Sequence, residues 1–567
     1  MKIYSIFFVC LLLPFTSDCF AEEEVDTIFL GGTVVTMNDD QPSAEAVAVS
    51  GGKIVAVGLK KDILPLKKDK TQIVDLKGKT LLPGFIDPHL HPYLAGLLLP
   101  MNFLAPEDWD LPGRTSKAVL DRETYLKRMT ELESKMDNKE SWLYVWGYHH
   151  YFHGEIDRRD LDKISSTRPI LLWHRSFHEL FLNTAALKEL GIEEKDVKGV
   201  PHTSWEKGHF YETGGEMVLP LLLPMLLEPN KYRNALKDFQ KLVQQGGITT
   251  IVDLSGYILG ETEFQLTKSV LDQPGVPFRT ILVADGMGPS KRFAANPATA
   301  VEFVKNLQKK NGDKVFFSNH VKLFSDGAFF SQLMQVNEPY TDGHKGEWLM
   351  TPLELKTAAR AFWHAGFQIH VHTNGDMGVD VVLDILEKLN AEKPNRDHRF
   401  TLEHFGLSTP EQCKRIGRLG ACVSANTYYL HILGELYSKK GLGPARAHHI
   451  SRMGSLAKNK VPTTYHSDMV MAPAKPLLLA WCAVNRRGVS GKELGPTEKV
   501  SVDDAMKAIT INAAFVLRQE KIAGSIEVGK RADFTILGQN PYKVDPMILK
   551  DIPVVATVFA GKLFENK

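Results

Sequence analysis

Two histidines stand one residue apart at the end of a candidate strand, in the sequence Gly84-Phe-Ile-Asp-Pro-His-Leu-His91. In a strand, His89 and His91 would face the same side and lie about 6.6 Å apart along the chain, which suits two ligands of one metal ion. A chain with 20 histidines also produces such pairs by coincidence. Two packed histidines therefore explain the pair equally well when it is taken alone.

Four further residues of metal-binding or catalytic type follow other candidate strands: Lys322, His372, His404 and Asp468. Each is expected at the carboxyl end of its strand, where active sites are built in parallel (β/α)₈ barrels. Five strand ends that all supply nitrogen, oxygen or lysine groups are difficult to explain as coincidence. The pattern predicts a metal site assembled from His89, His91, Lys322, His372, His404 and Asp468.

The strands that would position these residues alternate with helical patterns, which is typical of a parallel barrel. The predicted barrel strands are Gly84–His91, Thr249–Leu254, Phe278–Val283, His320–Phe324, Phe367–His372, Phe400–His404, Ala421–Ala425 and Thr463–His466. Helices are expected over Lys231–Gln245 and from the caps Thr351 and Ser501. We therefore predict an α/β fold with a (β/α)₈ barrel over residues 84–518.

Two other regions do not fit a simple barrel. The segment between the first and second barrel strands far exceeds a usual βα loop of about 2–6 residues, so we expect residues 97–230 to form an insertion that caps the barrel mouth. Short β patterns and glycine turns fill residues 22–83 and return in 519–567. These two ends are predicted to form one small composite β-sandwich domain.

The sequence resembles the amidohydrolase superfamily, in the amidohydrolase-3 or YtcJ-like branch that includes N-substituted formamide deformylase. The resemblance covers nearly the whole mature chain. It rests on Gly84–His91, Lys322-Leu-Phe-Ser-Asp-Gly327, His370-Val-His-Thr-Asn-Gly-Asp376, Leu402-Glu-His404, Ser467-Asp468 and Gly529-Lys-Arg-Ala-Asp533. It implies a barrel with a split β-sandwich and metals held by the matching residues. The segment Gly327-Ala-Phe-Phe-Ser departs from the family pattern, which leaves the substrate class open.

Lys322 needs a chemical explanation, because an ammonium group with a pKa of about 10.4 cannot bind a cation. Reaction with carbon dioxide would convert it into a carbamate whose two oxygens can bridge metals about 3.5–4 Å apart. We therefore expect two divalent ions, with zinc as the best fit, and an N6-carboxylated Lys322. The alternative is an unmodified lysine paired with Asp326 or with a substrate carboxylate.

The expected reaction is hydrolysis of a C–N, amide-like bond other than a peptide bond, by a metal-activated hydroxide. Asp468 would take the proton from water and return it to the leaving group. His178 is the second catalytic candidate, through contact with the substrate carbonyl, although a histidine merely hydrogen-bonded in place is equally compatible. His370 is expected below the ligands or in the core. The stretch from Trp142 to His153 could form a substrate pocket wall or an ordinary packed strand.

Two rival functions remain. A mononuclear deaminase on the same barrel would use His89, His91, His372 and Asp468, but normally adds a glutamate at the position of Gly375. A non-catalytic binding protein on a relic barrel would be expected to lose ligands. Metal content near two, one or zero ions per chain distinguishes the three readings.

The start of the chain has the layout of a signal peptide, with cleavage expected after Ala21, or of an uncleaved anchor. We expect a periplasmic or secreted protein with no stable membrane association after cleavage. Only Cys413, Cys422 and Cys482 would remain, which predicts buried thiols and no disulfide framework. With 68 basic and 67 acidic side chains, nothing suggests a nucleic-acid partner. The expected partners are a small-molecule substrate and a second copy in a homodimer.

Overall fold

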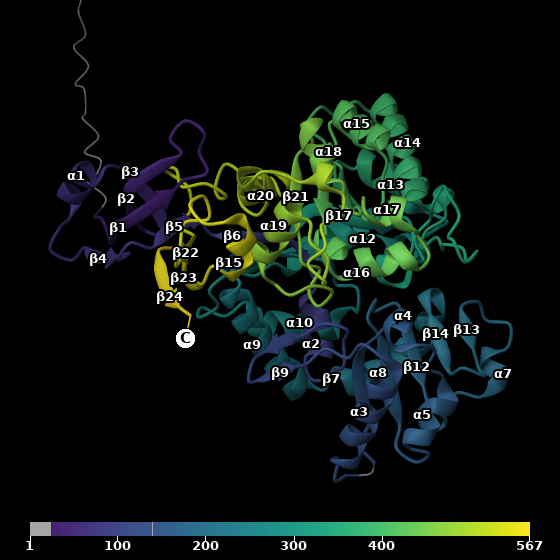
Figure 1. Cartoon of the computed structure of the whole chain (residues 1–567). Helices are drawn as coiled ribbons and strands as arrows, with labels where there is room; N and C mark the ends of the chain where they lie inside the picture. Colours follow the sequence, from purple (N-terminus) through teal and green to yellow (C-terminus); the bar gives the residue numbers. More distant parts are fainter. Residues whose placement is uncertain (1–23, 139, 567) are drawn as a thin grey trace, which may run out of the picture.

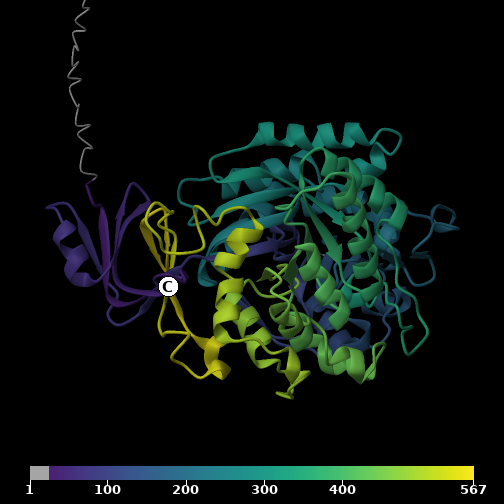
Figure 2. The same cartoon turned by 90° about the horizontal axis from the view of Figure 1, so that it is seen from above.

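The computed structural model describes residues 24–138 and 140–566, and its centre is a nearly closed parallel barrel (Figures 1 and 2). Its strands follow one another in chain order: β6 (Phe85–Leu90), β15 (Ile248–Gly256), β16 (Arg279–Asp285), β17 (Val315–Phe324), β18 (Gln368–Thr373), β19 (Thr401–His404), β20 (Cys422–Ala425) and β21 (Thr463–Tyr465). After β21 the chain returns to the end of β6, where the Asp468 amide donates a hydrogen bond to the His89 carbonyl at 2.9 Å. The predicted barrel is confirmed.

The helices around the barrel begin close to where their capping residues predict. Helix α13 (Pro352–His364) has Thr351 at its N-cap, and α20 (Val502–Ala508) has Ser501; both form a capping box with the residue three positions on. Helix α9 (Pro229–Gln245) begins two residues before the predicted start, with Glu228 as its cap. Its buried face packs against the barrel core.

The two ends of the chain share one mixed sheet beside the barrel, where purple and yellow strands adjoin in Figure 2. Its strand order is β24-β23-β22-β5-β1-β2-β3, with β4 paired to β1. These are β1 (Thr27–Val35), β2 (Ser43–Ser50), β3 (Lys53–Gly58), β4 (Gln72–Asp75), β5 (Thr80–Pro83), β22 (Phe534–Leu537), β23 (Val554–Phe559) and β24 (Lys562–Glu565). The antiparallel pair β5–β22 joins the two ends.

The long segment after β6 contains a sheet of its own, drawn in blue below the barrel in Figure 1. The order is β13-β14-β12-β11-β10-β7, built from β7 (Asn102–Phe103), β10 (Leu143–Tyr148), β11 (Ile170–His174), β12 (Glu179–Leu182), β13 (Thr203–Ser204) and β14 (His209–Tyr211). The short helix η2 (Glu212–Gly214) and helix α8 (Gly215–Leu226) lead back toward the barrel. The insertion is therefore a structured unit and not a long loop.

Cys413, Cys422 and Cys482 are free and buried, as the sequence predicts. Within residues 24–138 and 140–566, no helix is long and apolar enough to cross a membrane. The predicted signal peptide, residues 1–21, lies outside the described residues.

Candidate metal centre

One cavity of about 240 Å³ lies at the carboxyl ends of the barrel strands, and it brings the predicted site residues together. Its lining includes His89, His91, Lys322, His372, His404 and Asp468, and also His178 from the insertion. Barrel strands are parallel, so their carboxyl ends meet on one face, and residues far apart in sequence converge there.

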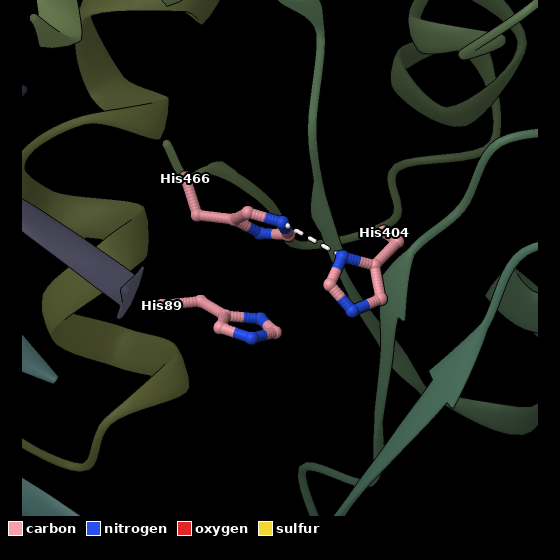
Figure 3. Close-up of side chains that lie close together, drawn as sticks. All are labelled: His89, His404 and His466. Atoms are coloured by element: carbon pink, nitrogen blue, oxygen red, sulfur yellow. Dashed lines mark hydrogen bonds between the residues drawn. The ribbon is translucent and has the colours of Figure 1, made fainter. Parts of the chain in front are cut away.

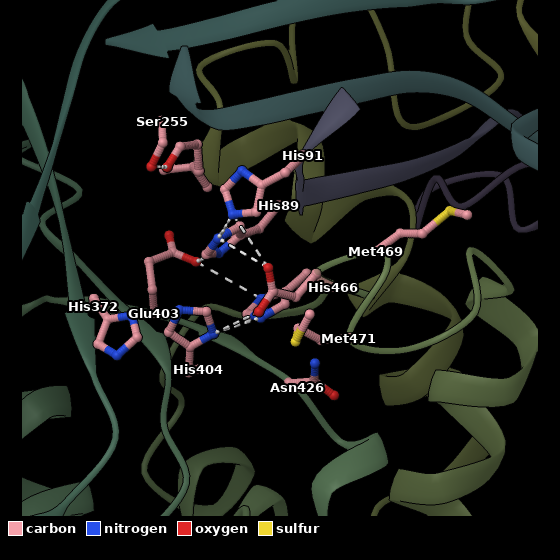
Figure 4. Close-up of polar contacts among 12 residues, drawn as sticks. His89, His91, Ser255, His372, Glu403, His404, Asn426, His466, Met469 and Met471 are labelled. Carbon is pink, nitrogen blue, oxygen red and sulfur yellow. Dashed lines mark hydrogen bonds and ion pairs between the residues drawn. The ribbon is translucent and has the colours of Figure 1, made fainter. Parts of the chain in front are cut away.

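His89 and His91 are oriented as metal ligands usually are (Figure 4). Nδ1 of His89 donates to Glu403 Oε2 at 2.8 Å, and Nδ1 of His91 donates to Asp253 Oδ1 at 3.1 Å. A neutral ring with its proton on Nδ1 has a lone pair on Nε2. The two Nε2 atoms lie 3.3 Å apart, so both lone pairs point into the same space.

Asp468 completes this group. Its Oδ1 lies 3.2 Å from His91 Nε2 and 3.7 Å from His89 Nε2. The three residues His89, His91 and Asp468 form a buried set able to hold a metal ion. Asp468 has a φ of 52° and His404 a φ of 72°. Such positive values cost of order 1–3 kcal/mol in residues other than glycine and occur most often at functional sites.

Lys322 points into the same group from β17. Its Nζ lies 3.5 Å from His89 Nε2, and the side chain is buried. Burial lowers the pKa of Lys322 to about 8, because the charged form is poorly solvated there. Asp326, the alternative partner, is instead engaged by the hydroxyl of Ser325 and the amides of Gln335, Asn374 and Gly375.

His404 and His372 stand on the other side of the cavity. Nδ1 of His404 lies 3.2 Å from Nε2 of His466, and Figure 3 shows these rings with His89 around one space. His89, His404 and His466 form a second buried set able to hold an ion. The His372 ring lies beside His404, with 4.4 Å between centroids, but His372 joins no such set among the described residues.

His178 enters the cavity from the loop between β11 and β12. Its Nδ1 pairs with Glu212 Oε2 at 2.8 Å, and its ring centroid lies 6.3 Å from that of His372. Burial opposes the charged ring, but the nearby carboxylates, Glu212 foremost with Asp468 and Glu179, together raise the pKa of His178. A protonated ring would leave Nε2–H free to donate to a bound carbonyl oxygen.

Several buried polar residues that support the site were not singled out from the sequence. Glu403 accepts hydrogen bonds from Nδ1 of His89 at 2.8 Å and from Nδ1 of His370 at 2.7 Å. His370 therefore supports the candidate ligand His89 through Glu403. Asp87 accepts the Ser467 amide at 3.2 Å and fixes the residue before Asp468. Glu403 and Asp87 lie inside the motifs that carry the family resemblance, so the sequence already pointed to them as candidate site residues. His466 and Asp253, at the ends of β21 and β15, could have been found from the same strand-end rule.

Residues 142–153 do not line this cavity; they contain β10 and the short helix α4 (His150–His153). A second histidine group, His149, His150 and His174, lies in that part of the insertion. Nδ1 of His149 accepts the Tyr151 amide at 3.2 Å, and Nδ1 of His174 accepts the Ser176 amide at 3.1 Å. Neutral rings that accept at Nδ1 carry their proton on Nε2 and offer no lone pair there. This geometry favours a structural role.

Comparison with known proteins is consistent with the site. Protein LONG AFTER FAR-RED 3 of Arabidopsis thaliana is 28% identical over 95% of this chain and 91% of its own length. Putative amidohydrolase YtcJ of Bacillus subtilis is 26% identical (95% and 99%), and N-substituted formamide deformylase of Arthrobacter pascens is 24% identical (95% and 98%).

Among solved structures, an uncharacterized metal-dependent hydrolase from Pyrococcus horikoshii has the same fold, with a TM-score of 0.69 and 22% identity over 92% of this chain and 99% of that one. The model of the amidohydrolase family matches residues 72–564, which include the whole barrel and strands β4, β5, β22 and β23 of the terminal sheet. This chain belongs to the amidohydrolase family.

Proposed function

We propose that this protein is a metal-dependent hydrolase that cleaves a C–N, amide-like bond, other than a peptide bond, in a small molecule. The observation that carries the proposal is the convergence of the six candidate ligands and His178 on one cavity. The name of the Arthrobacter pascens relative, a deformylase of N-substituted formamides, supports a C–N bond as the target.

The donor set fits divalent metal ions, because His89 and His91 direct Nε2 lone pairs toward Asp468. In this proposal these residues would hold one ion and His372 and His404 would hold a second, with carboxylated Lys322 as a further anionic ligand. Zinc suits a site of imidazole and carboxylate groups. Bound divalent ions would polarise the scissile carbonyl and lower the pKa of water toward about 7.

The surroundings of Lys322 favour carboxylation of its amine. A pKa of about 8 leaves roughly a tenth of the amine neutral at pH 7, far more than an ordinary lysine has. The neutral amine adds to carbon dioxide, forms an N–C bond and releases one proton, which gives an anionic carbamate. An uncharged or anionic Lys322 also removes the repulsion that an ammonium 3.5 Å from His89 would exert on a cation.

The proton transfers are assigned to side chains that line the cavity. Asp468, close to His89 and His91, takes a proton from the attacking water and delivers it to the departing nitrogen. His178, held by Glu212, donates a hydrogen bond to the carbonyl oxygen as negative charge develops there. The pairing with Glu212 keeps the ring oriented for that contact.

A mononuclear deaminase is the second candidate, because His89, His91 and Asp468 alone form a compact set. The position that would carry its proton-shuttling glutamate is Gly375. A Cβ there would lie 1.9 Å from the Gln335 carbonyl oxygen, so the backbone leaves no room for a side chain. The steric conflict favours the binuclear proposal.

The test combines metal analysis with turnover. The purified mature protein should contain close to two zinc ions per chain and hydrolyse at least one compound among N-acyl amines, N-acyl amino acids and cyclic amides. One ion per chain with release of ammonia would support the deaminase, and a metal-free chain without turnover would support a binding protein. Export to the periplasm or the medium is part of the proposal and is checked by the amino-terminal sequence of the mature protein.

A further inference from the structure

The cavity has two chemically different ends. The ligand cluster forms one end, and the other is mostly apolar, with aromatic side chains from the insertion facing aliphatic and aromatic side chains from the barrel. Its principal members are Leu94, Trp173, Phe177, Leu219 and Met287. The volume of about 240 Å³ is smaller than the usual range of about 300–1,000 Å³ for ligand pockets. A small molecule fits this space.

An aromatic pair forms the fixed part of the apolar end. The rings of Trp173 and Phe177 stack with 4.5 Å between centroids and 21° between planes. Trp173 Nε1 donates to the Phe177 carbonyl at 2.9 Å, which ties the loop after β11 to the strand. Phe177 has a φ of 70°, an uncommon conformation that places its ring against Trp173. Such a rigid platform is suited to apolar or aromatic groups.

The charged residues near this end are paired with one another. Glu212 is held by His178 at 2.8 Å, and Glu216 lies 3.6 Å from Lys291 Nζ. Lys291 and Lys322 are the lysines among the described lining residues, and Lys322 belongs to the ligand cluster. Lys291 and Glu216 are both partly exposed, so only a substrate carboxylate buried among the apolar side chains, out of reach of Lys291, would lack a cationic partner, which is unfavourable.

We propose that the site takes uncharged amides whose substituent is an aryl or branched alkyl group, and that it discriminates against amides bearing a carboxylate. The inference rests on the proposed function and specifies its substrate class. The scissile carbonyl faces the ligand cluster, and the apolar substituent lies against the Trp173–Phe177 platform.

The test uses compounds that differ in one group. N-acetylphenethylamine and N-acetylphenylalanine share the amide and the ring, but only the second has a carboxylate; N-ethylacetamide lacks the ring. Binding to metal-loaded Asp468→Asn protein is measured by calorimetry, so that turnover is not needed. We expect the neutral aryl amide to bind at least about tenfold more tightly than either other compound.

Variants of the platform provide the second arm. Phe177→Leu and Phe177→Ala should progressively weaken binding of the aryl amide, by about tenfold for alanine, and leave N-ethylacetamide unchanged. Phe181→Leu is a matched control, since Phe181 belongs to the same hairpin but packs in a separate core on the other face of the sheet. It should bind all three compounds as the parent protein does.

The outcomes separate the two proposals. If the carboxylate compound binds as well as the neutral aryl amide, or if neither aryl amide binds, the substrate class is wrong. If the neutral aryl amide binds selectively to the Asp468→Asn protein but the wild-type enzyme hydrolyses no amide, the substrate-class inference survives and the proposed hydrolysis fails.

Discussion

At the scale of single residues, the hydrogen bond made by one ring nitrogen decides what the other can do. His89 and His91 donate from Nδ1 to Glu403 and Asp253, so their Nε2 atoms are available as ligands. His149 and His174 accept hydrogen bonds at Nδ1, so their Nε2 atoms carry the proton and are not available as ligands. All four rings are buried, so burial does not separate the candidate ligands from the structural histidines.

Asp468→Asn should abolish proton transfer and retain the fold. An amide cannot accept the proton from water, and general acid–base catalysis typically contributes about 10²–10⁴-fold. We expect kcat to fall by that factor while the protein still binds zinc, because the histidine ligands remain. The comparison requires turnover and metal analysis on the same preparation. Activity within a few-fold of wild type would exclude Asp468 from this role.

Lys322→Ala should lose both metal and activity, because it removes the proposed anionic ligand at the centre of the cavity. Short carboxylates such as acetate or propionate, supplied with bicarbonate, should partly restore both. The measurements are zinc content after gel filtration and rate with increasing carboxylate. A variant that keeps its full zinc content without carboxylate would show that Lys322 is not a ligand.

At the scale of elements, the insertion is joined to the loop that carries Asp468. Arg175, fully buried after β11, donates from Nη2 to the Met471 carbonyl, pairs with Glu107 and stacks over the rings of Trp146 and Phe330. The Met471 amide in turn donates to the Asp468 carbonyl at 2.6 Å. We infer that Arg175 is a positioning residue that acts through this loop.

Arg175→Met should therefore lower kcat by about 10- to 100-fold, since small misplacements of catalytic groups have effects of that size. It also leaves the Glu107 carboxylate buried and unpaired, which destabilises the fold. The double variant Arg175→Met/Glu107→Gln should regain stability but not kcat. Thermal unfolding and kcat are measured together.

Arg168→Met is the matched control for this experiment, because Arg168 is also buried in the insertion but bonds only within it, to Glu133 and to the carbonyls of Met136, Asn138 and Ser141. Its loss should reduce stability without changing kcat of the folded enzyme. If the Arg175/Glu107 double variant has wild-type kcat, Arg175 serves stability alone.

At the scale of the whole molecule, a buried ion pair joins the barrel to the terminal sheet. Arg279 on β16 contacts Asp533 Oδ2 through Nη1 at 2.6 Å, and Asp533 Oδ1 accepts the Ala560 amide at 2.9 Å. Both side chains are less than a tenth exposed. Asp533, from the motif Gly529-Lys-Arg-Ala-Asp533, therefore links the terminal sheet to the barrel, and none of its hydrogen bonds or ion pairs within the described residues reaches the ligand cluster.

Asp533→Ala should reduce the free energy of unfolding by about 3–5 kcal/mol, because it leaves Arg279 as an unpaired buried charge. Zinc content and kcat of the protein that remains folded should not change. Lys507→Ala, which removes partly exposed pairs with Asp39 and Asp503, should have little effect on the same denaturant titration. An Asp533→Ala protein as stable as wild type would show that the pair does not couple the two units.

Local patterns in the sequence were sufficient to predict the barrel and most of the candidate ligands. Strand ends, capping residues such as Thr351 and Ser501, and the spacing of His89 and His91 specified the barrel, its helices and the candidate ligands, because these signals depend on neighbours in the chain. Position at a strand end was enough to bring Lys322 into the set, since a parallel barrel places all such ends on one face.

Properties that depend on contacts between distant segments could be read only from the folded chain. The tautomer of His89 depends on Glu403, the orientation of His178 on Glu212, and the environment of Lys322 on burial among several strands. The exclusion of a side chain at Gly375 likewise arises from the Gln335 carbonyl, forty residues earlier. Each is a matter of a few ångströms between groups whose sequence separation carries no information on distance.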